Sequence, residues 1–210
     1  MYIPDIYLEQ DWSLQEDLIK KYPLATVVTN GKEGLIANHI PFVLRTDSES
    51  GKKYLHAHLA KVNHQIPSLK ESTEVLVIFQ TDDSYISPSY YPTKQETHKV
   101  VPTWDFGAIH IYGKPRIIDD KTWVRSQLDA LTEQQEKELT QWTVDEAPER
   151  YVELIQKSIC GLEIEIERTE CKMKFEQKMK EQDIKGTICG LAKDGKQKVS
   201  DFVAKCNHFA

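Results

Sequence analysis

The stretch Tyr54-Leu-His-Ala-His-Leu-Ala-Lys-Val-Asn-His-Gln65 decides the fold. Its first half alternates ring-bearing residues with aliphatic ones, which predicts a strand with one buried face. Lys61 follows this strand at once, and Asn63 can cap a short helix behind it. A cation and a helix start at this spacing can hold an anionic group such as a phosphate. The same residues could also be an ordinary surface lysine beside a helix cap with no ligand. Both interpretations, a phosphate site and a solvent-exposed turn, stay open at this point.

The residues upstream of this stretch predict a helix and a hairpin. Ser13-Leu-Gln-Glu16 has the capping-box pattern and opens a helix that ends near Tyr22. Ala25 to Thr29 forms a β-branched strand that ends at an Asn30-Gly31 turn, and Leu35 to Leu44 returns beside it.

The residues downstream predict more strands and then helices. Val75 to Gln80 is an apolar strand, and Thr81 to Thr103 is a long irregular segment rich in aromatic residues. Phe106 to Ile118 is a strand in which Gly113 and Pro115 indicate a bulge or a sheet edge. Further predictions are a helix capped by Asp119-Asp120 and ending near Glu138, a helix over Pro148 to Ser158, an alternating strand around Leu162 to Ile166, and helix-prone residues after Cys171. Four or five antiparallel strands with helices late in the chain favour an α+β barrel over a doubly wound sheet.

Composition sets the broad class of the protein. The chain has 210 residues, 27 basic and 33 acidic ones, and a net charge of −6. No run of 18 apolar residues predicts a membrane span, and the N-terminus lacks the pattern of a secretory signal, so we expect a cytoplasmic protein. The four cysteines fit no zinc or redox spacing and are expected to be idle thiols. Lysines around Lys172 to Lys185 make the C-terminal third locally basic, but glutamates interleave there, which is typical of a solvated face.

Several chemistries lack their sequence signatures. The sequence contains neither of the two glycine-rich patterns that bind phosphate, G-x-x-x-x-G-K-[ST] and G-x-G-x-x-G. It also lacks the G-x-S-x-G elbow of a serine hydrolase. His56 and His58 share a strand face and could approach one ion, yet histidines that contact a ligand or are held by hydrogen bonds explain them better. We therefore expect no metal.

Nine short sequence motifs, in a fixed order along the chain, carry a family resemblance. They are Met1-Tyr-Ile-Pro4, Val28-Thr-Asn-Gly31, His39-Ile-Pro41, His56-Ala-His-Leu-Ala-Lys-Val-Asn63, Val77-Ile-Phe-Gln80, Tyr85-Ile-Ser-Pro-Ser-Tyr-Tyr91 with Val101-Pro-Thr-Trp104, His110-Ile-Tyr-Gly-Lys114, Gly161-Leu-Glu-Ile-Glu-Ile166 and Lys172-Met-Lys174. From Met1 to about Leu191 the chain resembles the PaiB-like family, described as FMN-binding negative transcriptional regulators. More distantly, Tyr54 to Ile66 is similar to a segment of the pyridoxamine-phosphate-oxidase-like split barrels.

The resemblance implies an antiparallel split β-barrel with flanking helices over residues 1–191, and it leaves 192–210 as an unassigned tail. It also implies an FMN cofactor and a homodimer with the flavin between two barrels. Ala60-Lys61 stands where the split barrels carry a basic pair, and His39 stands where they carry an arginine, so fewer fixed cations surround the phosphate. The implied cofactor-binding positions are Asn38, His39, Ile40, Pro41, His58, Ala60, Lys61, Asn63, Ser87, Thr103 and Trp104.

Three functions remain open at this stage. The first is a flavin-binding negative transcriptional regulator, although the acidic net charge and the lack of a visible helix-turn-helix give little support to direct DNA binding. The second is an FMN-dependent oxidoreductase that acts on a small molecule. The third is a barrel that has lost FMN and serves as an interaction module. No residue has a spacing that assigns it a catalytic role.

Overall fold

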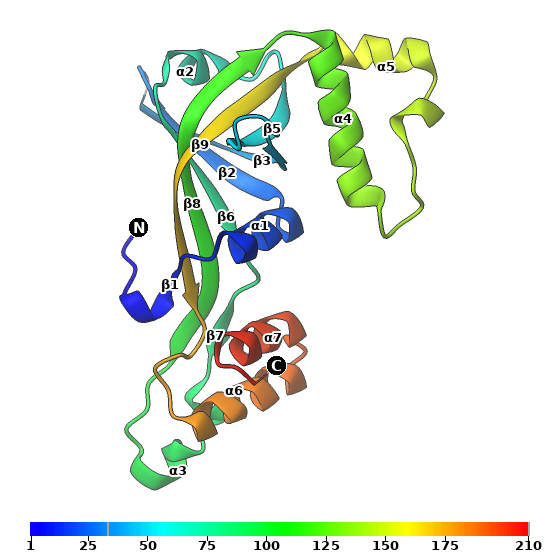
Figure 1. Ribbon diagram of the computed structural model, residues 1–210. Helices are drawn as coiled ribbons and strands as arrows, with labels where there is room; N and C mark the ends of the chain where they lie inside the picture. The colour runs from blue at the N-terminus through cyan, green and yellow to red at the C-terminus, as the bar shows by residue number, and fades with distance from the viewer. Residues whose placement is uncertain (33, 210) are drawn as a thin grey trace. The chain divides into compact units, whose positions relative to one another are not determined.

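The computed structural model describes residues 1–32 and 34–209, and its chain divides into two compact units. The central unit comprises Trp12–Phe79 and His110–Thr169. The terminal unit comprises Met1–Asp11, Gln80–Ile109 and Glu170–Ala210. Two 16-residue strands, β8 and β9, run through the division and contribute to both units (Figure 1). Within the described residues, no helix is both long and apolar enough to span a bilayer.

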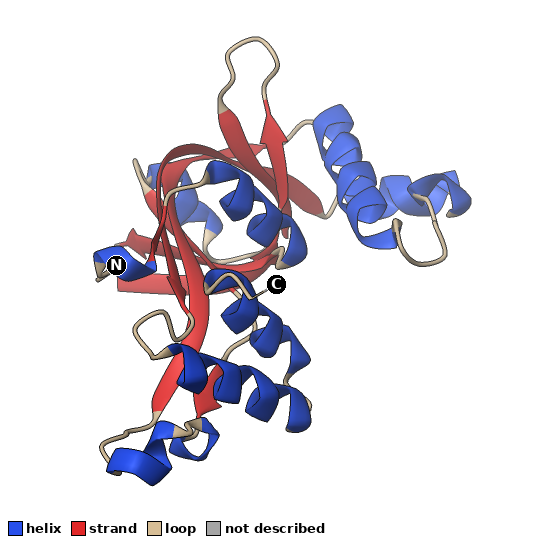
Figure 2. Ribbon diagram, turned by 60° about the horizontal axis from the view of Figure 1, so that its bottom comes forward, coloured by secondary structure: helices blue, strands red, loops and turns tan. Residues whose placement is uncertain are grey.

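A single antiparallel sheet carries the architecture, with helices around its strands (Figure 2). The α+β class is therefore confirmed, although the described chain has more strands than the five or six predicted. The sheet order is β3 (Gly34–Pro41), β2 (Leu24–Gly31), β6 (Val75–Gln80), β8 (Thr103–Ile118), β9 (Ile159–Lys174), β5 (Lys53–Ala60) and β4 (Val43–Thr46).

Strand β5 has the burial pattern that its sequence predicts. Leu55, Ala57 and Leu59 are buried, whereas the ring-bearing residues between them stay partly exposed. The buried face joins a core that includes Phe42 and Phe79, whose rings meet edge to face at 6.2 Å. Each fully buried side chain of this size contributes about 1.5–3 kcal/mol to the free energy of unfolding.

The hairpin between β2 and β3 turns two residues later than predicted. Asn30 pairs with Leu35 and Gly31 with Gly34, so both predicted turn residues are strand residues. Lys32 is a turn residue, and residue 33 lies outside the described residues. Gly31 is needed for another reason, because a Cβ there would lie 2.8 Å from the hydroxyl oxygen of Ser68. A close approach of helix and strand, rather than a turn, accounts for this glycine.

The predicted edge at Gly113 and Pro115 is wrong. Strand β8 lies inside the sheet, between β6 and β9. A Cβ on Gly113 would lie 2.2 Å from the carbonyl oxygen of Glu165 in β9. The glycine therefore marks a close backbone approach in the sheet interior.

Four helices accompany the strands of the central unit. They are α1 (Trp12–Lys21), α2 (Ile66–Glu71), α4 (Lys121–Glu136) and α5 (Glu149–Gln156), with a short 3-10 turn, η3, over Val144–Glu146. Asp120 caps α4 as predicted, because its Oδ1 accepts a hydrogen bond from the backbone N–H of Trp123 at 2.7 Å.

The terminal unit contains short strands and helices. Strand β1 (Leu8–Glu9) pairs with β9, and β7 (Ser84–Ile86) pairs with β8. The segment predicted as irregular, Thr81 to Thr103, holds β7, the 3-10 helix η2 (Pro88–Tyr90) and α3 (Thr93–Thr97). The other helices here are η1 (Asp5–Tyr7), α6 (Glu181–Lys193) and α7 (Gln197–Cys206).

The predicted tail is a packed helix. Val199, Phe202 and Val203 of α7 are buried, and the Phe202 ring stacks on Phe175 at 5.0 Å. The assignment of residues 1–191 to one barrel domain stays a prediction. All four cysteines are free, with Cys160 and Cys171 buried.

Candidate functional site

Lys61 occupies the turn between β5 and α2. Its backbone N–H donates to the carbonyl oxygen of Ser158 at 2.8 Å, which fixes the main chain. Its ammonium lies 2.7 Å from Oδ1 of Asp119, and both side chains are exposed, at 40% and 75%. The hydrogen bond from Lys61 lowers the pKa of the Asp119 carboxyl. An exposed pair of this kind adds little stability, so the ammonium is available to another anion.

Asn63 shapes the turn but does not cap α2. Its Oδ1 accepts a hydrogen bond from the backbone N–H of Gln65 at 2.9 Å, while the N-cap residue, Gln65, forms no side-chain cap bond. The predicted helix cap is thus an Asx turn that stands just before the helix. Within the described residues, the backbone N–H groups of Val62 and His64 meet no acceptor.

Gln65 links this turn to the hairpin, and the sequence did not single it out for a role. Its side chain is fully buried, and its Nε2 donates to the carbonyl oxygens of Val27 and Ile36 at 3.0 and 3.2 Å. Its Oε1 accepts from Nδ2 of Asn38 at 2.9 Å. Asn38 is thereby brought to the turn, as predicted. A buried glutamine with all these partners rigidly positions the Lys61–Gln65 turn against β2 and β3.

The neighbours of Asn38 on β3 are placed differently. His39 is exposed and lies opposite Thr26. Because side chains alternate along a strand, it points away from the face that carries Asn38. Ile40 is buried and Pro41, at the end of the strand, is half-buried. Of this predicted group, the described contacts bring only Asn38 to the Lys61–Gln65 turn.

His58 faces helix α4. Its Nδ1 lies 2.8 Å from Oε1 of Gln127, so the imidazole donates to the amide. Ala60 ends β5 and is exposed. His56, two residues before His58, lies with its Nε2 3.0 Å from Oε2 of Glu163. No cluster of three metal-binding side chains occurs within residues 1–32 and 34–209.

The other three predicted positions belong to the terminal unit. Ser87 caps η2, and its Oγ accepts from the backbone N–H of Ser89 at 3.1 Å. Thr103 Oγ1 accepts from Nζ of Lys174 at 2.7 Å. Trp104 is 52% exposed, donates from Nε1 to Asp83 at 2.6 Å, and meets the Tyr85 ring edge to face. Their role at a cofactor stays a prediction.

A buried charge cluster in the same unit escaped sequence analysis. Lys174 donates to Asp105 at 3.2 Å, and the Asp105 side chain is fully buried. Burial raises the pKa of Asp105 to about 7, and the nearby carboxylate of Glu176 adds to this. Burial also raises the pKa of Glu176, against a hydrogen bond from Tyr91 that lowers it. Asp105 and Glu176 are 71 positions apart, so no local pattern could have paired them.

The Lys61–Gln65 turn has the donors that a phosphate monoester needs. A compact ammonium at the surface supplies positive charge, and the N–H groups of Val62 and His64 supply main-chain donors. The buried Gln65 holds the turn in place before any ligand arrives. These residues therefore fit the phosphate end of a flavin mononucleotide.

Comparison with known proteins points the same way. Residues 1–168 match the model of a family described as "Putative FMN-binding domain". The chain is 42% identical over 156 residues to the uncharacterized protein YKL070W of Saccharomyces cerevisiae, a match that spans 65% of this chain and 91% of that relative. It is 29% identical over 193 residues to the protease synthase and sporulation protein PAI 2 of Bacillus subtilis, spanning 90% and 87%.

A solved structure supports the fold. The FAD and heme binding protein of Mycobacterium smegmatis superposes with a TM-score of 0.55 at 18% identity, covering 80% of this chain and 73% of that one. At this identity the likeness speaks for the fold alone. The predicted antiparallel split β-barrel is confirmed.

Proposed function

Because this chain belongs to the FMN-binding domain family, we propose that it holds FMN with the phosphate at the Lys61–Gln65 turn. The resemblance to the PaiB-like family is confirmed by the family match and the Bacillus relative. The observation that carries the placement is the exposed Lys61 ammonium beside the two N–H groups that lack acceptors. When bound, FMN supplies one- and two-electron redox chemistry.

Each residue of the turn has a distinct task in this proposal. Lys61 balances phosphate charge, and Asn63 keeps the N–H groups of the turn oriented. Gln65 and Asn38 hold the turn against β3. His58, fixed by Gln127, offers a polar contact further along β5.

Replacement of Lys61 by alanine tests the placement. A hydrogen bond to a charged group is worth about 1.5–3 kcal/mol, so the Kd for FMN should rise at least about tenfold. Quenching of FMN fluorescence during titration measures this Kd. Lys32→Ala is the matched control, because Lys32 is an exposed lysine of the same unit, paired with Glu71 at 3.2 Å. Equal Kd values for the two variants would contradict the placement.

We also propose that the protein acts as a negative transcriptional regulator. The PaiB-like resemblance supports this role. Three lysines of the locally basic C-terminal third already have partners: Lys172 lies over the Phe106 ring, Lys174 contacts Asp105, and Lys185 pairs with Glu181.

A gel shift with the promoter of its own transcription unit, run at several salt concentrations, tests direct DNA binding. Direct binding predicts a shift that weakens steeply as salt rises. Lack of any shift at low salt would rule direct binding out and leave regulation through another protein.

We further propose that the protein forms a homodimer. The exposed Tyr85 and Trp104 rings support this proposal, because exposed aromatic rings are typical of interfaces. Light scattering would detect the dimer as twice the mass of one chain.

A further inference from the structure

A pocket of the central unit lies between the sheet and helix α4, and no residue of the Lys61–Gln65 turn lines it. Its volume is about 430 Å³, and Tyr54 and His56 of β5 line it. His56 and Ala60 are four positions apart on one strand, so roughly 13 Å of β5 separates the pocket from the turn. The proposed FMN placement meets this pocket only through Gln127, whose Oε1 holds His58.

Strand register brings the sheet side of the pocket together. Arg45 of β4 lies directly opposite Tyr54, and His56 lies opposite Glu163 of β9. Residues that oppose one another, or stand two apart on one strand, share a face of the sheet. Arg116 of β8 joins them through two hydrogen bonds to Oε1 of Glu163, at 2.7 and 3.1 Å.

Helix α4 supplies the other side with one of its faces. The spacing of its lining residues is that of a single helical stripe. These residues are Trp123, Ser126, Gln127 and Ala130.

The pocket has an aromatic wall with a fixed position. The His56 ring lies 4.8 Å from Trp123 and 6.2 Å from Tyr54. A Cβ on Gly161 would lie 2.3 Å from the Trp123 ring, so the indole rests directly on the β9 backbone. Such a wall suits a flat, partly apolar ligand.

Positive charge remains unused at the mouth of this pocket. The Arg45 side chain makes no hydrogen bond or ion pair with the described residues. Burial is the main cause that lowers the pKa of the His56 imidazole; Glu163 raises this pKa, and the nearby Arg45 charge lowers it. Glu163 is already engaged by Arg116, and Asp47 accepts hydrogen bonds from the residues of its own turn. A free guanidinium fork is the group that recognises a carboxylate.

A buried donor completes the set. Gln127 is only 2% exposed, and its Nε2 has no hydrogen-bond partner among the described residues. Its Oε1 is held by His58, which fixes the orientation of the amide. A buried N–H group without an acceptor is costly, and a ligand oxygen or a π-face in the pocket would relieve that cost.

We propose that this pocket binds a small planar aromatic carboxylate. The carboxylate pairs with the Arg45 guanidinium, the ring lies against His56 and Trp123, and the Gln127 amide faces the ligand. The charge and the flatness of the ligand are recognised by different groups, so each can be tested with a different probe.

Benzoate, benzamide and cyclohexanecarboxylate are suitable probes for the full-length protein. Titration calorimetry with benzoate should show saturable binding. Loss of the charge in benzamide, or of the flat ring in cyclohexanecarboxylate, should weaken binding about tenfold each. Arg45→Ala should weaken benzoate about tenfold as well, since a charge-assisted hydrogen bond is lost.

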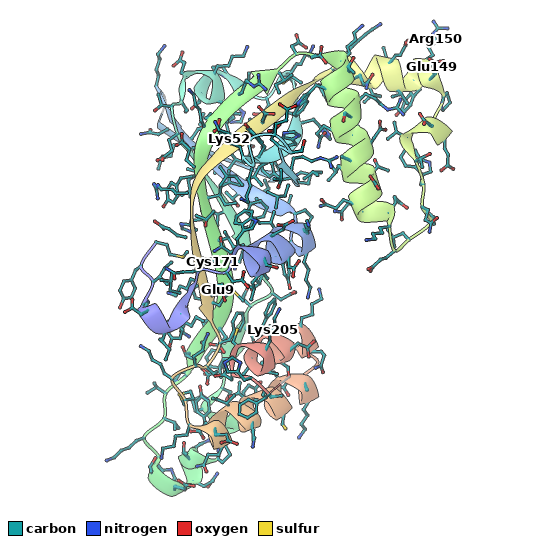
Figure 3. The ribbon with its side chains drawn as sticks, in the orientation of Figure 1. Glu9, Lys52, Glu149, Arg150, Cys171 and Lys205 are labelled. Carbon is teal, nitrogen blue, oxygen red and sulfur yellow. The ribbon has the colours of Figure 1, made fainter. Side chains whose placement is uncertain are left out.

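Arg150→Ala is the matched control variant. Arg150 is an exposed arginine on α5, labelled in Figure 3, and does not line the pocket. It should bind benzoate as the unmodified chain does, and circular dichroism should show both variants folded. The proposal is overturned by absence of benzoate binding up to about 10 mM, by equal affinities of the two arginine variants, or by benzamide binding as tightly as benzoate.

Discussion

The ion pairs Lys61–Asp119 and Lys174–Asp105 share the same chemistry but differ in their burial. Lys61 and Asp119 of the central unit lie 2.7 Å apart with both side chains exposed. Lys174 and Asp105 of the terminal unit lie 3.2 Å apart, with the aspartate fully buried. The shorter contact is the weaker determinant of stability, because water already solvates both of its partners. Burial, not distance, decides which pair supports the fold and which leaves its cation free for a ligand.

Replacement of Lys174 by methionine should give the largest effect. Thr103, Asp105 and the carbonyl oxygen of Trp104 would all lose their shared donor. Loss of one partner of a buried pair costs about 3–5 kcal/mol, so the midpoint of urea unfolding at pH 8 should fall sharply. Lys61→Met should change the free energy of unfolding by less than about 0.5 kcal/mol. If Lys174→Met and Lys61→Met lost similar amounts of free energy of unfolding, burial would not be what distinguishes the two ion pairs.

The two pairs also illustrate which features of the fold could be predicted from the sequence. The strand at Tyr54 to Leu59 and the Asp120 cap were predictable, because a period of two and a helix cap depend on neighbouring residues. The Asn30-Gly31 turn was misplaced because strand pairing continued through it. A turn signal gives way where the register favours two more pairs.

The site was predictable only in part, for the same physical reason. Lys61 was predicted from its local sequence and Asn38 from the family resemblance, but Gln65 acquires its role by contacting two strands, β2 and β3, at once. In the sequence, Lys174 belongs to a stretch typical of a solvated face. In the structure it is the cation of a buried cluster, because distant carboxylates fold around it. The burial of a residue by partners far away in the chain cannot be predicted from the pattern of its neighbours in a single sequence.

The second prediction concerns pH. The pKa of Asp105 is raised to about 7 in the folded protein, whereas an aspartate in an unfolded chain titrates near 4. The folded state therefore holds more protons in between, and stability should fall as pH rises from about 4 to about 7, by up to about 1.4 kcal/mol per pH unit. Asp105→Asn should flatten this fall, although Glu176, whose pKa is also raised, should leave part of it.

Asp119→Asn is the control for this pH profile. The pKa of Asp119 is lowered in the folded protein, so its contribution has the opposite sign and is present only above the unfolded pKa. The fall in stability between pH 4 and 7 should persist in this variant. Urea unfolding at a series of pH values measures both profiles. An unchanged slope in Asp105→Asn would show that Asp105 is not the group that binds the proton.

The smallest effect should come from Asp119→Asn on the affinity for FMN. The Asp119 carboxylate competes with the FMN phosphate for the Lys61 ammonium. Because an exposed pair is weak, removal of the competing charge should tighten FMN binding by only roughly two- to threefold. Asp129→Asn is the matched control, since Asp129 is an exposed aspartate of the same unit, paired with Arg125. The gain should shrink as ionic strength rises, because exposed charges are screened. Weaker FMN binding in Asp119→Asn would mean that Asp119 orients Lys61 toward the phosphate, and the exposed pair would then be part of the site and not its competitor.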